Sequence, residues 1–208
     1  MNVRNKSILF FLILVFNILS AELGWEAGVF VTKPLLMPLL GWLLVGSDGA
    51  RVKWVWFALV FSWLGDMLLM LPMDLFVFGL GSFLLAHIFY IRHFWGVWNR
   101  AQITFRPLYL LLVGLYLGLL LYLLFPTLGS LQVPVIVYGL VISTMLLLAL
   151  HSGRSGYRWG AALFVLSDSI LAINKFHTPL PLSALWVMGT YGWAQYGIVF
   201  SSRTDKFE

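Results

Sequence analysis

The sequence predicts an all-α, polytopic integral membrane protein with eight transmembrane helices and both termini in the cytoplasm. Three observations predict this class: the composition, the apolar runs and the distribution of basic residues. Of the 208 residues, 61% are hydrophobic and 10% are charged, whereas a soluble domain carries about 25% charged residues. The chain therefore lacks the polar surface that a water-soluble protein needs. No long polar stretch interrupts it, so residues 1–208 are expected to form a single transmembrane domain.

The apolar runs give the number of helices. A transmembrane helix needs roughly 20 apolar residues, within a usual range of about 17 to 25. Eight runs of this kind lie at about 7–23, 29–46, 54–71, 75–95, 107–125, 131–150, 158–175 and 183–201. In lipid, only helices and closed barrels satisfy every backbone group, and these unbroken runs lack the alternation of barrel strands. Each run is therefore predicted to be a helix.

The first segment has a second interpretation. Arg4 and Lys6, followed by an apolar stretch, are also typical of a signal peptide. Cleavage after Ala21 would leave Leu19 at a position where a small residue is expected. We therefore interpret this segment as a transmembrane helix.

Turn-forming residues separate most of the later segments, as expected of short connections. They lie at 46–49, 72–74, 126–130, 152–156 and 178–181. Within the second segment, Pro34 and Pro38 interrupt the helical hydrogen bonding, because proline has no N–H group to donate.

The basic residues give the orientation. The N-terminus and the connections after the second, fourth, sixth and eighth segments hold all but two of the 13 Lys and Arg residues. These are Arg4, Lys6, Arg51, Lys53, Arg92, Arg100, Arg106, Arg154, Arg158, Arg203 and Lys206. Cytoplasmic loops carry such an excess of basic residues, so this side is predicted to be cytoplasmic. Because the net charge of +5 comes from short loops, it does not indicate a nucleic-acid partner.

Two aspartates, Asp66 and Asp168, are predicted to lie within the membrane. An ionisable group at that depth costs at least about 2.5–3.5 kcal/mol on insertion scales, and it is a functional hypothesis by default. At a rise of ~1.5 Å per residue, both aspartates lie at a similar level in the outer half of their helices. Neither is close enough to a helix end for its short side chain to reach water. The alternative is that each is paired with a lysine and only holds the bundle together.

Other polar side chains gather near that level. They are Glu22, Lys33, Asn174 and Lys175 near the outer helix ends, Tyr138 and Tyr191 in the outer half, and His87 and Gln195 nearer the middle or inner half. Apart from Glu22, we predict that these residues bind the substrate. Simpler explanations also exist: Lys33 could extend to the interface, and His87 could donate a hydrogen bond between helices. The two tyrosines could be packing residues.

Metal, thiol and serine chemistry are not indicated. The chain has no cysteine, which excludes disulfides, thiolate ligands and cysteine nucleophiles. Besides His87, the histidines are His93 and His151, expected at the inner face, and His177 at the outer face, away from the aspartates. There is no HExxH or HxxxH spacing, no GxSxG elbow and no glycine-rich phosphate loop. We therefore expect neither a metal nor another cofactor.

Several short stretches together resemble the YhhN family of membrane proteins, the lysoplasmalogenases. They are Lys33-Pro34-Leu35, Gly65-Asp66, residues 79–90 around His87, Tyr138, residues 160–172 around Asp168 with Phe176, and Tyr191 with Ala194-Gln195. The resemblance covers residues from about 30 to 200. No single stretch is specific, but their joint order and spacing are.

The resemblance implies an eight-helix fold and hydrolysis of the vinyl ether bond of a lysophospholipid, the lysoplasmalogen. The products would be a fatty aldehyde and glycerophosphoethanolamine or glycerophosphocholine. It also implies that Asp66 and Asp168 carry the reaction. The protein is then expected to contact membrane lipid as a multi-pass protein of the bacterial inner (cell) membrane.

Such a reaction needs two carboxyl groups in different protonation states. A vinyl ether is hydrolysed by protonation of its β-carbon, which gives an oxocarbenium ion that water captures. One carboxylic acid must deliver the proton, and one carboxylate must stabilise the cation and activate water, as in glycoside hydrolysis. Two acids in one apolar site differ in this way when a cation lies beside one of them. Lys33 is the candidate for that cation or for a phosphate contact, and either aspartate is a candidate for the acid.

Two other functions use the same residues. A proton-coupled transporter of lipids or small molecules also needs buried aspartates. The similar stretches around Asp66 and Asp168 are compatible with a parallel duplication of four helices, although no pair of broken helices at matching positions supports it. A structural or regulatory membrane protein would need no chemistry at all.

Overall fold

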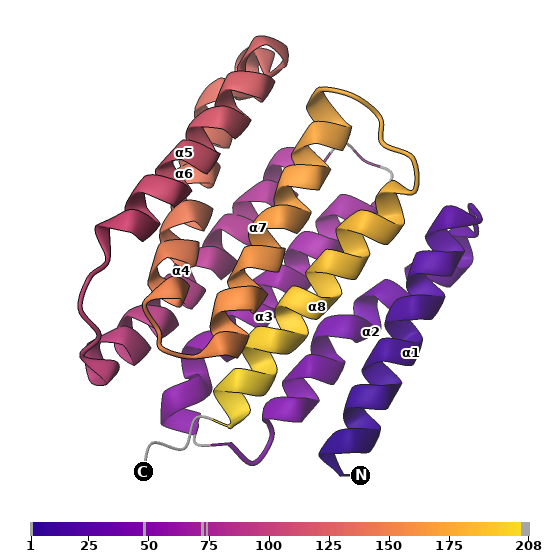
Figure 1. Cartoon of the computed structure of the whole chain (residues 1–208). Helices are drawn as coiled ribbons and strands as arrows, with labels where there is room; N and C mark the ends of the chain where they lie inside the picture. Colours follow the sequence, from indigo (N-terminus) through magenta and orange to yellow (C-terminus); the bar gives the residue numbers. More distant parts are fainter. Residues whose placement is uncertain (1, 48, 72, 74, 205–208) are drawn as a thin grey trace.

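The computed structural model describes residues 2–47, 49–71, 73 and 75–204, except the side chains of residues 50 and 51. These residues form α-helices and two short 3-10 turns, and no β-strand occurs among them (Figure 1). The elements in chain order are α1 (Val3–Glu22), α2 (Glu26–Leu44), α3 (Gly49–Met70), α4 (Phe76–Ala101), α5 (Pro107–Leu124), η1 (Phe125–Thr127), η2 (Gly129–Leu131), α6 (Gln132–Leu150), α7 (Ser155–Phe176) and α8 (Ser183–Arg203). The predicted all-α class is therefore confirmed, and an α-helix lies over each predicted segment. Some predicted features lie outside the described residues: Asp48, Pro72 and Asp74 in the connections, Lys206, and the side chain of Arg51.

Seven of the described helices are long and apolar enough to cross a membrane. They are α1, α2, α3 from Val52, α4, α5 continued to Thr127, α6 from Gly129, and α7. Helix α8 is not among them, although it has 21 residues. It is less apolar because Thr190, Gln195 and Ser202 interrupt its apolar residues. Length and composition therefore support seven of the eight predicted spans.

Helix α8 nevertheless lies inside the bundle. It packs along α7 and also contacts α1, α2 and α3 (Figure 1). Ala194, Gln195 and Ile198 are fully buried on its inner face. The small residue Gly160 of α7 permits a close approach to α8, because a Cβ added there would lie 3.0 Å from the Ala194 carbonyl oxygen. Gln195, which lowers the hydropathy of α8, is thus one of the residues on the face that packs against the other helices.

Helix α2 continues through both of its prolines. Pro38 has no N–H, so the carbonyl of Pro34, four residues earlier, lacks its helical donor. The indole N–H of Trp63 in α3 donates to this carbonyl at 2.9 Å. An unpaired carbonyl within a bilayer costs several kcal/mol, so this side chain satisfies the backbone at the proline and joins α2 to α3 next to Lys33.

The beginning of α1 and the end of α8 lie at the same end of the bundle (Figure 1). Their basic side chains meet the C-terminal end of α2: Lys6 Nζ donates to the carbonyl of Trp42 at 2.8 Å, and Arg203 Nη1 donates to that of Leu43 at 2.5 Å. Basic groups at a helix C-terminus are stabilising, because they satisfy free carbonyls and complement the helix dipole. These contacts join the two ends of the chain through α2.

Candidate active site

The two aspartates, Asp66 and Asp168, line one cavity. It has a volume of about 210 Å³ and lies among α2, α3, α4, α6, α7 and α8. Its polar lining residues are Lys33, Asp66, Tyr138, Ser167, Asp168 and Tyr191. The remaining lining is apolar, with Leu69, Phe76, Leu80, Phe83, Leu171 and Phe176 among its members. The bundle thus brings two carboxyl groups, a lysine and two tyrosines into a largely apolar space.

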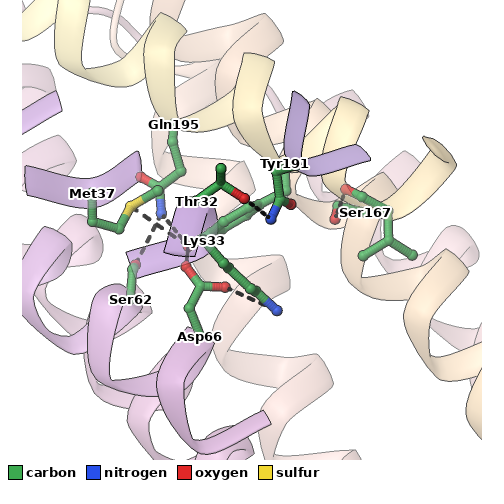
Figure 2. Close-up of polar contacts among 10 residues, drawn as sticks. Thr32, Lys33, Met37, Ser62, Asp66, Ser167, Tyr191 and Gln195 are labelled. Carbon is green, nitrogen blue, oxygen red and sulfur yellow. Dashed lines mark hydrogen bonds and ion pairs between the residues drawn. The ribbon is translucent and has the colours of Figure 1, made fainter. Parts of the chain in front are cut away.

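Asp66 is held by a lysine and a tyrosine. Its Oδ1 lies 3.8 Å from Lys33 Nζ, and its Oδ2 accepts a 2.8 Å hydrogen bond from the Tyr191 hydroxyl. Figure 2 shows Lys33 reaching Asp66 from α2. Asp66 is buried, and the Lys33 side chain is 16% exposed. This carboxyl group therefore has a positive charge on one side and a neutral donor on the other.

Asp168 has a different environment. Its Oδ2 accepts a short hydrogen bond from the Tyr138 hydroxyl and lies 3.9 Å from Nε2 of His87. In the described part of the chain, no lysine or arginine nitrogen lies within 4 Å of Asp168. The two aspartates therefore differ in their neighbours: a cation lies beside Asp66, whereas a phenol and an imidazole lie beside Asp168.

Two residues of α8 bond to two residues of α3, one of which is Asp66. Ser62 and Asp66 are four residues apart, as are Tyr191 and Gln195, so each pair lies on one helix face. One turn from the Tyr191–Asp66 bond, Gln195 Nε2 donates to Ser62 Oγ at 2.9 Å (Figure 2). Gln195 also donates to the Tyr191 hydroxyl at 3.4 Å and accepts a hydrogen bond from Tyr90 of α4. Because the amide occupies the acceptor side of the Tyr191 oxygen, the single phenolic hydrogen is directed to Asp66.

His87 is fully buried beside the cavity and does not line it. Neither of its ring nitrogens has a hydrogen-bond partner. The ring makes edge contacts with Tyr138 and Phe164, with centroids 5.3 and 4.7 Å apart. Buried polar atoms without partners carry a desolvation cost. If His87 served only for packing, an apolar side chain of similar size would therefore stabilise the fold more than the imidazole does.

Four predicted substrate-binding residues do not line the cavity: His87 and Gln195 lie beside it, and Asn174 and Lys175 have contacts elsewhere. Asn174 Oδ1 accepts a hydrogen bond from the Leu180 backbone N–H at 2.8 Å, which orders the connection from α7 to α8. Lys175 Nζ lies 5.2 Å from the centre of the Phe76 ring, outside the lining of the cavity. The prediction from depth was incomplete for these residues, because a shared level in the membrane does not determine the direction of a side chain around its helix.

Two of the other histidines, His93 and His151, have partners away from the cavity. His93 pairs with the Tyr157 hydroxyl at 3.1 Å, and His151 accepts a hydrogen bond from the Arg106 backbone N–H at 2.9 Å. No group of three or more His, Cys, Asp or Glu side chains with metal-binding geometry occurs in the described residues. His93 therefore contributes to a contact between helices, and His151 binds a backbone group.

Sequence reasoning missed three residues at the site. Ser62 is uncharged, but its position four residues before Asp66 was a signal that it shares a helix face with that aspartate. Ser167 lines the cavity, and its hydroxyl donates to the Val187 carbonyl at 2.9 Å. Met37 lies 3.6 Å from the Tyr191 hydroxyl through its sulfur atom, a contact that no sequence pattern indicated.

Comparisons with known proteins bear on this site. The model of the YhhN family matches residues 29–202. The chain is 38% identical to Lysoplasmalogenase TMEM86B of Homo sapiens over 186 residues, covering 87% of this chain and 77% of that protein. It is 33% identical to Lysoplasmalogenase TMEM86A of Homo sapiens, covering 83% and 73%, and 36% identical to the Lysoplasmalogenase of Mycobacterium tuberculosis, covering 62% and 52%. No solved structure matches the chain.

Proposed function

Because this chain belongs to the YhhN family, as its sequence motifs predicted, we propose that it is an intramembrane lysoplasmalogenase. It hydrolyses the vinyl ether bond of a lysoplasmalogen and releases a fatty aldehyde with glycerophosphoethanolamine or glycerophosphocholine. The names of the relatives support the reaction class. The observation that carries the mechanism is the pair of aspartates with unlike neighbours at one apolar cavity.

The reaction adds one water molecule across the vinyl ether. A carboxylic acid transfers its proton to the β-carbon of the alkenyl chain, and the π electrons of the double bond form the new C–H bond. The α-carbon becomes part of an oxocarbenium ion, which the nearby carboxylate stabilises. Water adds to that carbon and loses a proton to the carboxylate. The hemiacetal then collapses, with its hydroxyl proton passing to the leaving oxygen, to give aldehyde and alcohol.

The neighbours of the two aspartates support an assignment of roles. A positive charge close to a carboxyl group favours its ionised form, and burial without a cation favours the neutral form. Lys33, 3.8 Å from Asp66, makes Asp66 the carboxylate that stabilises the cation and activates water. Asp168, which has Tyr138 and His87 beside it, is then the acid that protonates the β-carbon.

The size and lining of the cavity suit the reacting part of the lipid. At about 210 Å³, it is smaller than the roughly 300–1,000 Å³ of sites that enclose a whole small ligand. It therefore holds the vinyl ether and its nearest atoms, and the chain and headgroup extend beyond it. The apolar lining keeps water scarce around the oxocarbenium ion and strengthens its interaction with Asp66.

Aldehyde release from a lysoplasmalogen by purified protein in detergent tests this function. The Asp66→Asn and Asp168→Asn variants should each lose at least about 100-fold in kcat, the range for removal of a general acid or base, while melting within a few degrees of the wild type. Near wild-type turnover by either variant would exclude the two-aspartate mechanism. Absence of turnover on every vinyl-ether lipid, with substrate-dependent proton flux in liposomes, would instead favour a transporter.

We also propose that the chain forms one transmembrane domain of eight spans with both termini in the cytoplasm. The shared end of the bundle for the start of α1 and the end of α8 supports an even number of crossings (Figure 1). Because the chain lacks cysteine, single cysteines can report the topology. Thr178→Cys should react with an impermeant maleimide in intact cells, whereas Thr104→Cys and Thr204→Cys should react only after permeabilisation. Labelling of Thr178→Cys and Thr204→Cys from the same side would exclude a crossing by α8.

A further inference from the structure

A second recess adjoins the catalytic cavity. It lies at the N-terminal end of α2 and the C-terminal ends of α1 and α3, and it has a volume of about 470 Å³. Its lining includes Ser20, Glu26, Phe30, Lys33, Leu69 and Met70. Lys33 and Leu69 also line the cavity with the two aspartates. The recess and the cavity therefore meet at these two side chains.

The recess carries one acidic and one basic side chain on the same face of α2. Glu26 and Lys33 are seven residues apart, which corresponds to about two helical turns with a drift of ~20°. Their Cα atoms are therefore separated by roughly 10 Å along the helix axis. Glu26 is exposed, and no lysine or arginine nitrogen lies within 4 Å of its carboxylate among the described residues. Lys33 Nζ has Asp66 at 3.8 Å and further donors available for another anion.

We infer that this recess binds the zwitterionic headgroup of the lysophospholipid, with the phosphate at Lys33 and the ammonium group at Glu26. The inference rests on the proposed function and names the part of the substrate that the cavity does not hold. An ammonium beside a carboxylate and a phosphate beside a lysine are the complementary charge pairs for an ethanolamine or choline phosphate. The recess lies at the ends of the helices, where the polar headgroups of a bilayer lie.

The opposite rim of the cavity is less suited to this headgroup. Phe76 of α4 and Phe176 of α7 meet there edge to face, with ring centroids 5.5 Å apart. Lys175 lies over the Phe76 ring. Among the described residues, no acidic side chain lines the cavity apart from Asp66 and Asp168, so the described part of this rim offers a cation for phosphate but no carboxylate for an ammonium group.

The position of the headgroup also orders the substrate along the cavity. With the phosphate at Lys33, the glycerol and the ether oxygen follow next, beside Asp66. The β-carbon lies one bond further along the chain than the α-carbon and so faces toward Asp168. This order agrees with Asp168 as the proton donor and Asp66 as the carboxylate at the oxocarbenium ion.

The test compares two substrates, one with and one without the aminoethyl group that carries the ammonium: a 1-alkenyl-glycerophosphoethanolamine, which is a phosphodiester, and a 1-alkenyl-glycerophosphate, which is a phosphomonoester. Glu26→Gln should raise KM for the ethanolamine lipid about two- to tenfold, as expected from the loss of one partly exposed ion pair, with kcat unchanged. It should not raise KM for the glycerophosphate. Glu26→Lys should lower KM for the glycerophosphate and raise it for the ethanolamine lipid.

Glu22→Gln is the matched control. Glu22 also lies at this end of the bundle, but its Oε1 accepts a hydrogen bond from the Leu185 backbone N–H at 2.8 Å and does not line the recess. This variant should leave both KM values within about twofold, since surface charges that do not touch the ligand contribute little. Equal changes for both substrates in Glu26→Gln, or no change for either, would overturn the headgroup assignment.

If the wild type accepts only the ethanolamine lipid, the two substrates cannot be compared, and product inhibition provides a second measurement. Glycerophosphoethanolamine should inhibit the wild type and Glu22→Gln competitively, with an inhibition constant about two- to tenfold higher in Glu26→Gln. An unchanged constant would overturn the assignment. A wild type that releases no aldehyde from any vinyl-ether lipid would instead contradict the proposed function itself, so the two failures are distinguishable.

Discussion

The hydroxyl of Tyr191 donates a 2.8 Å hydrogen bond to Oδ2 of Asp66, although the two residues are 125 positions apart in the chain. The bond joins α8 to α3 inside the helical bundle, and Gln195 and Ser62 join the same helices one turn away. Tyr191 therefore orients the Asp66 carboxylate and also supplies one of the hydrogen bonds that stabilise its charge. A carboxylate that must meet a developing cation gains from being held in this way.

Tyr191→Phe removes this bond and keeps the ring, which packs edge to face against Phe83 and Phe164. Hydrogen bonds to charged groups contribute about 1.5–3 kcal/mol, so kcat should fall about 10- to 100-fold, with little change in melting temperature. Aldehyde release and thermal unfolding in detergent measure the two effects. Tyr196→Phe is the control, because Tyr196 bonds to Ser7 of α1 outside the cavity. Equal losses in both variants would show that Tyr191 acts only through packing.

Lys33→Gln should lower kcat at least about tenfold, because Asp66 would lose the charge that keeps it ionised. Lys33→Arg retains the charge and should recover most of the activity. Lys53→Gln removes a lysine that lies over Trp54 outside the cavity, and it should change turnover less than twofold. Full activity in Lys33→Gln would favour the simpler explanation that Lys33 extends to the interface.

His87→Phe separates a chemical role of the imidazole from a packing role. The substitution replaces two buried nitrogens that lack partners by carbon, so the free energy of unfolding should rise or stay constant. We expect kcat to fall at least about tenfold, since the imidazole Nε2, which lies 3.9 Å from Asp168 Oδ2, would no longer be available to return a proton to that carboxyl group. Thermal unfolding and aldehyde release decide together: wild-type turnover in a stable His87→Phe protein would assign the residue to packing alone.

The contact between Trp63 and the Pro34 carbonyl predicts a coupling between two substitutions. Trp63→Phe leaves that carbonyl without a donor, and we expect a loss of about 1–3 kcal/mol in the free energy of unfolding. Pro38→Ala restores the helical N–H that proline lacks. In the Pro38→Ala background, Trp63→Phe should therefore cost about 1 kcal/mol less, which a double-mutant cycle measures. Additive losses would mean that the indole N–H does not replace the missing helical donor.

The helices were predictable because lipid imposes a simple rule on sequence. A span must be apolar and long, and its backbone must be satisfied internally. The error lies at an end: α4 was expected to stop at about residue 95 and continues to Ala101. The predicted run ended before Arg100, but basic side chains extend to the interface without ending a helix. Composition alone does not identify α8 as a candidate span, and Gln195 on its buried face is one of the residues that lower its hydropathy.

The site was only partly predictable. Depth correctly brought Asp66, Asp168, Lys33, Tyr138 and Tyr191 to one cavity. The same argument placed Asn174 and Lys175 nearby. Instead, the Asn174 side chain bonds to the α7–α8 connection, and that of Lys175 lies over the Phe76 ring. Residue number gives height along a helix through the fixed rise per residue. It does not give the rotation of one helix against another, which depends on how side chains pack between them.

By itself, the sequence predicted the membrane class, the positions of the helices and two aspartates within apolar segments, because each follows from local composition and the cost of burying charge. Only the tertiary structure decided that Lys33 pairs with Asp66 and that Tyr138 and His87 lie beside Asp168. It also decided that Glu26 lines the same recess as Lys33. These relationships join residues from different helices. They arise from close packing across the bundle, which no single segment of the chain contains.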